Sequence, residues 1–211
     1  MPEERYTIFV KRIEGRIERH GRDSLSEDCI RYEYFTALLE AEKLKSCDLL
    51  LEYFHPNLKF NKKGKRKIDC VLMDIANKPK EAIEFKLFPS RSNYAASVEG
   101  IGSIFADCYR LLNTNIPQKT IVLVSMGNMS KYINNPFNGF NFLFEESSSE
   151  KYIDAAFINS IKAKGFLKSI KEKTFPEFLP FAFYMKRVFL KTVYCCTLSV
   201  FNINIDINET L

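Results

Sequence analysis

The segment 68–88 constrains the fold of this chain more than any other stretch, because its pattern predicts two strands joined by a tight turn. Residues 68–75 form a β-branched and apolar run that acids interrupt, and residues 81–88 form a second such run that ends at Pro89. Residues 76–80 between them are polar and include a proline, which is typical of a turn. Two strands with so short a connection predict an antiparallel β-hairpin.

Two acids and a lysine fall on this predicted hairpin. Alternate residues of a strand point to the same face, so Glu84 and Lys86 are expected to project together, while Phe85 and its apolar neighbours cover the other face. Asp69 lies on the preceding strand and is expected to come close enough to Glu84 to share a cation. The alternative is a surface hairpin whose acids and lysines only keep an exposed edge soluble.

A helix is predicted to begin at Ser24 and to end near Lys45. Ser24 followed by Glu27 three positions later has the pattern of a capping box. At about 100° per residue, Glu27 falls within the apolar stripe of this helix, whereas Glu33 lies roughly 100° away from it. Glu27 is therefore the first candidate for an acid that points at the sheet, with helix capping as its alternative role. Glu33 is the second candidate, with a solvated helix face as its alternative.

The stretch after the hairpin continues the same alternation of elements. Residues 97–112 repeat apolar side chains at helical spacing, and residues 119–126 form a buried strand by composition. The predicted order is therefore helix, hairpin, helix, strand. Together with an acid on the first helix, Asp69, and the Glu84–Lys86 pair, this order resembles the PD-(D/E)xK nuclease superfamily over about residues 24–126.

The resemblance implies an α/β, restriction-endonuclease-like fold: a mixed sheet with an antiparallel central hairpin, flanked by helices. It implies that Glu27 (or Glu33) is the first-helix acid, Asp69 the motif aspartate, Glu84 the second acid and Lys86 the motif lysine. Ile68 stands where the motif name has proline. It further implies a metal-dependent hydrolase that cuts DNA, of restriction or repair type, and often a homodimer, because cutting two strands needs two symmetry-related sites.

The same residues support this chemistry when they are considered by themselves. Mg²⁺ prefers hard oxygen ligands, and Asp69, Glu84 and the backbone carbonyl of Phe85 are the expected protein ligands, with Mn²⁺ as a substitute ion. Such an ion activates water and offsets charge that develops on a phosphate. Lys86 is expected to act mainly as a positive charge in the transition state, and Glu27 to hold a second ion or its waters.

A run of basic residues leads directly into Asp69. It is expected to contact phosphates on either side of the cut bond, and its alternative is an ordinary solvated turn around Gly64. The predicted DNA-binding residues are Lys62, Lys63, Lys65, Arg66, Lys67 and Arg91, and Arg110 extends the same surface.

Composition limits the remaining possibilities. With 211 residues and 46% hydrophobic content, the chain is expected to form one domain: a core over about 24–126, an insertion or lid at 127–149, and a helix plus further strands at 150–211. No segment is long and apolar enough to cross a bilayer, no signal peptide is recognisable, and the six cysteines lack metal-binding spacing. The expected location is cytoplasmic, with reduced cysteines.

Several segments outside the hairpin leave two interpretations open. Phe137, Phe140 and Phe142 in the predicted lid stack on bases or, alternatively, pack onto the domain. Residues 152–173 are predicted to form one helix, and residues 181–205 one or two strands.

For the whole chain, the alternative to an Mg-dependent endonuclease is a non-catalytic nucleic-acid-binding or interaction module that retains the same fold.

Overall fold

The computed structural model of this chain describes residues 2–58, 67–88, 98–127, 139–144, 150–161, 164–173, 182–194 and 196–205.

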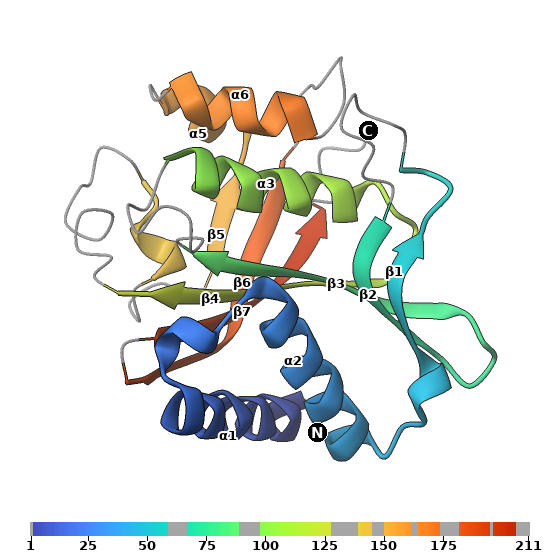
Figure 1. The fold of residues 1–211 in the computed structure, drawn as a ribbon. Coiled ribbons are helices and arrows are strands. Elements are labelled where there is room, and N and C mark those ends of the chain that lie inside the picture. The colour runs from blue at the N-terminus through green and yellow to red at the C-terminus, as the bar shows by residue number, and fades with distance from the viewer. Residues whose placement is uncertain are drawn as a thin grey trace.

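The molecule is built on a mixed sheet of seven strands in the order β1-β2-β3-β4-β7-β6-β5 (Figure 1). Its strands are β1 (Leu49–Phe54), β2 (Lys67–Met73), β3 (Pro79–Phe88), β4 (Gln118–Met126), β5 (Glu150–Ile153), β6 (Phe183–Val193) and β7 (Cys196–Ile205). Within the described strands, β3 and β4 pair in parallel and every other neighbouring pair is antiparallel. The chain is therefore an α/β protein, and the predicted antiparallel hairpin is confirmed as β2–β3.

Helices cover both faces of this sheet (Figure 1). They are α1 (Pro2–His20), α2 (Glu27–Glu42), α3 (Val98–Leu112), α5 (Ala155–Ser160) and α6 (Lys164–Lys173), with short 3-10 turns η1 (Arg22–Ser24), η2 (Ser46–Asp48) and η4 (Asn141–Leu143). The helices α1 and α2 pack beneath the sheet in Figure 1, and α3 lies above it with α6 packed on α3. None of the described helices is long and apolar enough to span a membrane.

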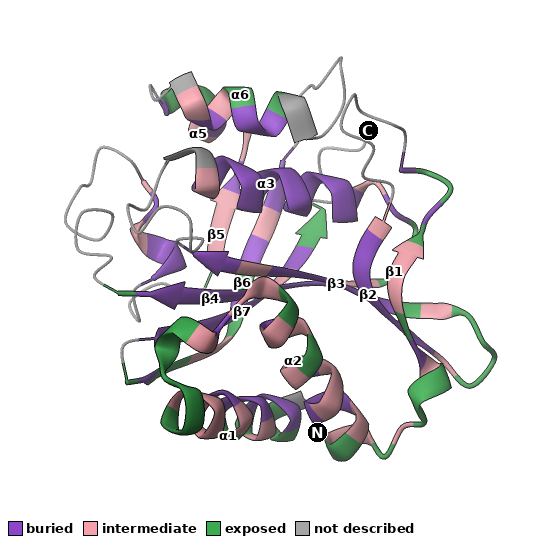
Figure 2. Ribbon diagram, in the orientation of Figure 1, coloured by how far each residue is buried: buried purple, intermediate pink, exposed green. Residues whose placement is uncertain are grey.

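Alternation along the strands divides the apolar side chains between two cores. Ile83, Phe85 and Leu87 of β3 belong to the core under α1 and α2, as the sequence predicts. Ala82 and Phe88 belong to the second core, under α3. Because both faces are covered, β2, β3 and β4 are buried along most of their length (Figure 2).

The start of α2 differs from the sequence prediction. Ser26, and not Ser24, is the N-cap, and its hydroxyl accepts a hydrogen bond from the Cys29 backbone N–H at 3.1 Å. Ser24 lies in η1, where its hydroxyl donates to the Gly21 carbonyl at 2.7 Å. The helix ends at Glu42, before the predicted Lys45, because Lys43 adopts a left-handed conformation with φ of 52°.

A buried ion pair fixes α1 to the sheet. The Arg5 guanidinium donates to both carboxylate oxygens of Glu81 on β3, at 2.8 Å and 3.2 Å, and also to the Tyr6 hydroxyl at 2.9 Å. Thr120 on β4 donates to the same carboxylate at 2.6 Å. These contacts satisfy two charges that have almost no access to water and so define how the N-terminal helix docks.

The C-terminal third departs from the prediction of one helix over 152–173. Tyr152 lies in β5 opposite Tyr184 of β6, and the helix begins only after Asp154, whose carboxylate accepts from the Phe157 backbone N–H at 2.6 Å. The second helix of this stretch is α6, which packs on α3. The prediction of further strands over 181–205 is confirmed by β6 and β7.

Two of the three phenylalanines considered for base stacking lie inside the molecule. Phe140 and Phe142 are buried in the core under α3, which confirms the packing interpretation for both. Phe137 lies outside the described residues. Of the described cysteines, Cys70, Cys108 and Cys196 are buried free thiols, Cys29 is partly buried and Cys47 is exposed.

Candidate functional site

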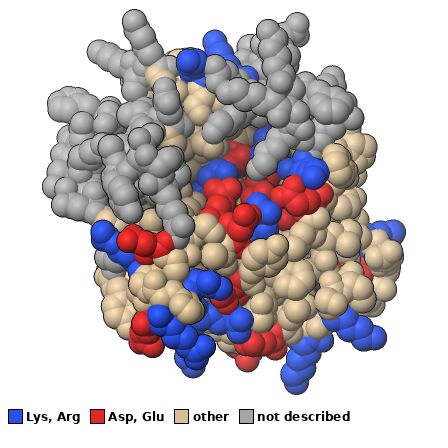
Figure 3. All heavy atoms as spheres, viewed as in Figure 1, with Lys and Arg blue, Asp and Glu red and all other residues tan. Residues whose placement is uncertain are grey.

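A cluster of charged side chains lies where β1, β2 and β3 approach the N-terminal turns of α2 and the C-terminal half of α3. Figure 3 shows acidic and basic groups gathered in a hollow at the centre of this face. Ion pairs join its described members in two groups, which are Asp28, Arg31, Glu52, Lys67 and Asp69, and Glu27, Glu84, Lys86, Asp107 and Arg110. A hydrogen bond from Arg110 to the Lys67 backbone carbonyl links the two groups. The sequence therefore predicts the location of this cluster through Asp69, Glu84, Lys86 and Glu27.

The Asp69 side chain extends the pairing of β2 with β3 beyond the last pair of main-chain partners. The main-chain register pairs Cys70 with Ile83, and beyond it Asp69 Oδ2 accepts a hydrogen bond from the Phe85 backbone N–H at 3.0 Å. Asp69 Oδ1 accepts from Arg31 of α2 at 3.1 Å. The Asp69 carboxylate is almost fully buried, and these two hydrogen bonds hold it to both the sheet and α2.

Glu84 lies on the face of β3 that is turned toward α3. Its Oε1 accepts a hydrogen bond from Arg110 Nη2 at 2.7 Å, and its side chain has no exposed surface. The same guanidinium contacts Asp107 at 2.5 Å and the backbone carbonyl of Lys67. Burial disfavours a charged Arg110, but Glu84 and Asp107 more than offset this effect and raise its pKa.

Lys86 projects from the same face of β3 as Glu84, as alternation predicts. Its Nζ lies 2.8 Å from Asp107 Oδ2 and 3.7 Å from Glu27 Oε1. Burial alone lowers the pKa of such an ammonium group, but Asp107, Glu27 and Glu84 outweigh it and hold the pKa of Lys86 well above its ordinary value. Lys86 is therefore a fixed positive charge at neutral pH in this arrangement.

The structure separates the two candidates for the first-helix acid. Glu27, in the first turn of α2, lies within reach of Lys86, and its side chain is about one-third exposed. Glu33 instead pairs with Arg12 at 2.9 Å and Arg16 at 2.6 Å, in the contact between α1 and α2. Glu27 is the acid of α2 that joins the cluster with Lys86, and the N-cap role belongs to Ser26.

Of the predicted DNA-binding residues, Lys67 lies within the described part of the chain. Its Nζ is 3.3 Å from Glu52 Oε2, at the rim of the cluster. Arg110 is only 3% exposed, and its guanidinium pairs with Glu84. The prediction that Arg110 extends the basic DNA-binding surface is therefore wrong, because its side chain points from α3 toward β3. The other predicted residues, Lys62, Lys63, Lys65, Arg66 and Arg91, lie outside the described residues.

Three members of the cluster were not singled out from the sequence: Asp28, which pairs with Arg31, Arg31 itself, and Asp107. Arg31 follows Glu27 by four positions on α2, which places both side chains on one helix face. Asp107 precedes Arg110 by three positions in a helix that is otherwise largely apolar. Charged pairs at helical spacing, Glu27 with Arg31 and Asp107 with Arg110, were the available signal for both arginine–acid faces.

The donor chemistry of the cluster fits a hard divalent cation, although the described side chains do not form a ready coordination site. Asp69 and Glu84 supply buried carboxylates from neighbouring strands, and carboxylate oxygens are the ligands that Mg²⁺ prefers. In this arrangement Arg31 and Arg110 contact those carboxylates. Within the described ranges, no group of three or more His, Cys, Asp and Glu side chains is disposed to hold a metal ion. An ion at Asp69 would therefore compete with Arg31.

Comparisons of the chain with protein-family models, curated proteins and solved structures gave no match. The resemblance to the PD-(D/E)xK superfamily therefore stays a prediction from the sequence.

Proposed function

We propose that this chain is a Mg²⁺-dependent endonuclease with a restriction-endonuclease-like fold, which hydrolyses phosphodiester bonds of DNA. The observation that carries the proposal is the convergence of Asp69, Glu84, Lys86 and Glu27 from two strands and a helix. Strand alternation and helix periodicity single out the same four side chains in the sequence.

The arrangement suits stabilisation of a negatively charged phosphate. Lys86 retains its proton because Asp107 and Glu27 surround it, so its role is to balance charge that develops on the phosphate oxygens. Asp107 positions the ammonium group, since it bridges Lys86 and Arg110 on neighbouring elements. The buried setting strengthens these charge interactions relative to water.

Asp69 and Glu84 would hold the divalent cation, with the Phe85 carbonyl as a further candidate ligand. When bound, such an ion activates water and polarises a phosphate oxygen. The chain itself supplies rigidity, because Asp69 is fixed to the Phe85 backbone N–H. Lys67, at the rim of the cluster, is proposed to contact the DNA backbone. Lys62, Lys63, Lys65, Arg66 and Arg91 belong to the same proposed set from the sequence alone.

A homodimer belongs to the same proposal, because cleavage of both strands of a duplex requires two sites related by symmetry. Analytical ultracentrifugation of the chain with and without duplex DNA measures this directly. A monomer that nicks only one strand per binding event would contradict the dimer.

The second candidate is a non-catalytic nucleic-acid-binding module. The observation that favours it is that guanidinium groups, Arg31 and Arg110, contact the two carboxylates that an ion would need. The two candidates differ in one measurable property, which is whether the carboxylates exchange their arginine partners for a metal ion.

The test is cleavage of supercoiled and linear duplex DNA in Mg²⁺ or Mn²⁺, compared with EDTA. Lys86→Ala is expected to abolish cutting, whereas Lys78→Ala, a control at an exposed turn lysine outside the cluster, is expected to retain it. Circular dichroism of both variants checks that each is folded.

Isothermal titration with Mg²⁺ on the wild type and on Asp69→Ala separates the remaining outcomes. Cutting that requires the metal and Lys86 supports the endonuclease. Absence of both cutting and metal binding in the folded wild type would overturn it and leave the binding module.

A further inference from the structure

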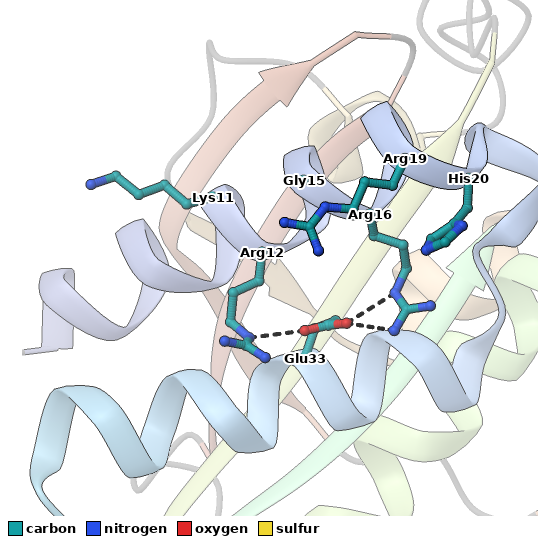
Figure 4. Close-up of a pocket in the computed structure, with 7 residues that line it drawn as sticks. All are labelled: Lys11, Arg12, Gly15, Arg16, Arg19, His20 and Glu33. Carbon is teal, nitrogen blue, oxygen red and sulfur yellow. Dashed lines mark hydrogen bonds and ion pairs between the residues drawn. The ribbon is translucent and has the colours of Figure 1, made fainter.

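A pocket of about 270 Å³ opens between α1 and α2, away from the charged cluster described above (Figure 4). Its lining is predominantly basic and consists of Lys11, Arg12, Gly15, Arg16, Arg19, His20 and Glu33. We propose that this pocket binds a phosphate group.

The pocket exists because of how α1 is composed. Residues three and four positions apart share a helix face, so Arg12, Gly15, Arg16 and Arg19 form one stripe. Gly15 interrupts this stripe of long side chains, and a Cβ built at Gly15 meets nothing within 4 Å. The missing side chain leaves an open space in the middle of a row of guanidinium groups.

Glu33 organises the inner wall of the pocket. Arg16 donates to Glu33 Oε1 through Nε and Nη2, at 2.9 Å and 2.6 Å, and Arg12 donates to Oε2 through Nε at 2.9 Å. Figure 4 shows both arginines turned from α1 onto this one carboxylate of α2. Their geometry is thereby fixed before any ligand arrives, which reduces the entropy lost on binding.

The charges of the pocket are not balanced internally. The lining holds four basic side chains, Lys11, Arg12, Arg16 and Arg19, and one acid, Glu33, which pairs with Arg12 and Arg16. Glu40, outside the lining, pairs with Arg12 at 3.1 Å. A positive surplus therefore remains even when His20 is neutral. Among the described residues, Lys11, Arg19 and His20 form no ion pair or side-chain hydrogen bond, and all three are exposed.

The chemistry favours a phosphate over a carboxylate. A phosphate carries up to two negative charges and presents several acceptor oxygens, and guanidinium forks match that geometry. Figure 4 shows Arg19 extending back along α1 toward Gly15, while Arg12 and Arg16 line the opposite wall. The phosphate can come from a nucleic-acid backbone or from a free phosphorylated molecule. Figure 3 shows Lys and Arg side chains gathered over α1 on the same face as the charged hollow.

The test is calorimetric titration of the full chain with pyrophosphate, in EDTA and at constant low salt. Gly15→Glu places a carboxylate in the pocket without a steric clash at Cβ, and is expected to weaken binding at least tenfold. Arg19→Gln, which breaks no internal contact, is expected to weaken it at least threefold. Gly15→Ala and the exposed turn variant Lys78→Gln are the matched controls and are expected to stay within twofold of the wild type.

A second titration distinguishes the two sources of the phosphate. Its ligand is a labelled 12-base-pair DNA duplex, and fluorescence anisotropy measures the binding. If Gly15→Glu weakens DNA binding as much as pyrophosphate binding, the pocket holds a backbone phosphate. If Gly15→Glu affects pyrophosphate alone, the ligand is a free phosphorylated molecule. Equal affinities of Gly15→Glu and Gly15→Ala for both probes, or no saturable binding by the wild type, would overturn the proposal.

This outcome is independent of the nuclease proposal. EDTA prevents metal-dependent cleavage during the titrations, and the pocket lining shares no residue with the cluster of Asp69, Glu84 and Lys86. A catalytically inactive chain can therefore still confirm the phosphate pocket, and an active one can still refute it.

Discussion

Replacement of Arg31 by alanine is expected to lower stability in EDTA and to strengthen the binding of Mg²⁺. Arg31 contacts Asp69 at 3.1 Å, and the exposed fractions of the two side chains are 14% and 1%. Removal of one partner from a buried ion pair costs about 3–5 kcal/mol, because the other charge stays buried. Arg31 retains some contact with solvent, so the lower end, about 3 kcal/mol, is expected for the loss of unfolding free energy.

The other contacts of Arg31 add little to this value. Glu52 and Asp28 are 41% and 74% exposed, and exposed pairs contribute less than about 1 kcal/mol each. For a chain of this length, 1 kcal/mol corresponds to about 2–4 °C in Tm, so the variant should melt about 6–12 °C below the wild type in EDTA. Arg22→Ala is the matched control, since the side chains of its ion pair with Asp23 are 53% and 73% exposed and its loss should cost at most about 1 kcal/mol.

Saturating Mg²⁺ should reduce the deficit of Arg31→Ala. The guanidinium contacts the carboxylate that the proposed ion would use, so its removal is expected to tighten ion binding at least tenfold, equivalent to about 1.4 kcal/mol of additional stability. The assay is differential scanning calorimetry in EDTA, in Mg²⁺, and in KCl of matched ionic strength to isolate charge screening. A deficit below about 1 kcal/mol in EDTA, or one that Mg²⁺ and KCl change equally, would refute this reasoning.

Further predictions concern packing, burial and pH. Gly102→Ala should destabilise the chain by about 1–3 kcal/mol, because the new Cβ lies 2.6 Å from a backbone oxygen of α6. Gly15→Ala, in open space within α1, should instead stabilise the chain by about 0.5–1 kcal/mol. Urea denaturation measures the unfolding free energy of both variants. Glu81→Ala should cost about 3 kcal/mol in the same assay, since the buried Arg5 guanidinium loses its bidentate partner and is left with the more exposed Glu42, 3.3 Å away, as its acidic partner. A loss below about 1 kcal/mol would contradict the role of the Arg5–Glu81 pair. Burial raises the pKa of the Cys70 thiol to about 12, so the folded state keeps a proton that the unfolded chain loses above about pH 9. This contribution to stability is complete below about pH 9 and is lost toward pH 12. Between pH 9.5 and 11, the unfolding free energy should therefore fall less steeply in Cys70→Ala than in the wild type, by about 1.4 kcal/mol per pH unit. Equal slopes of unfolding free energy against pH in the two proteins would exclude a contribution from the Cys70 thiol.

The hairpin and its facing side chains could be predicted because their causes are local. Strand alternation places Glu84 and Lys86 together whatever the rest of the chain does. The polar turn, predicted at 76–80 and found at 74–78, brings β2 and Asp69 back beside them. The helix 97–112 and the strand 119–126 were likewise visible as apolar periods and differ from α3 and β4 by one residue at their starts.

Predictions failed where two local signals competed. Ser24 and Ser26 both precede Glu27 closely, and the capping role depends on which serine has extended backbone angles at the helix start, which Ser26 has. Residues 152–173 have helical composition throughout, yet Tyr152 joins the sheet because β6 offers an edge with which it can pair.

The sequence by itself determined the hairpin, the helix and strand that follow it, the covered faces of β3, and the presence of two acids and a lysine at one place, because these follow from periodicity within short segments. Tertiary structure alone decided that Arg31 and Arg110 contact the two acids, that Asp107 positions Lys86, and that α1 and α2 enclose a basic pocket around Glu33. Each of these pairings joins residues on different elements, and the choice of partner depends on helix docking and strand order. Those depend on how all the apolar faces are buried together, which no single stretch of sequence encodes.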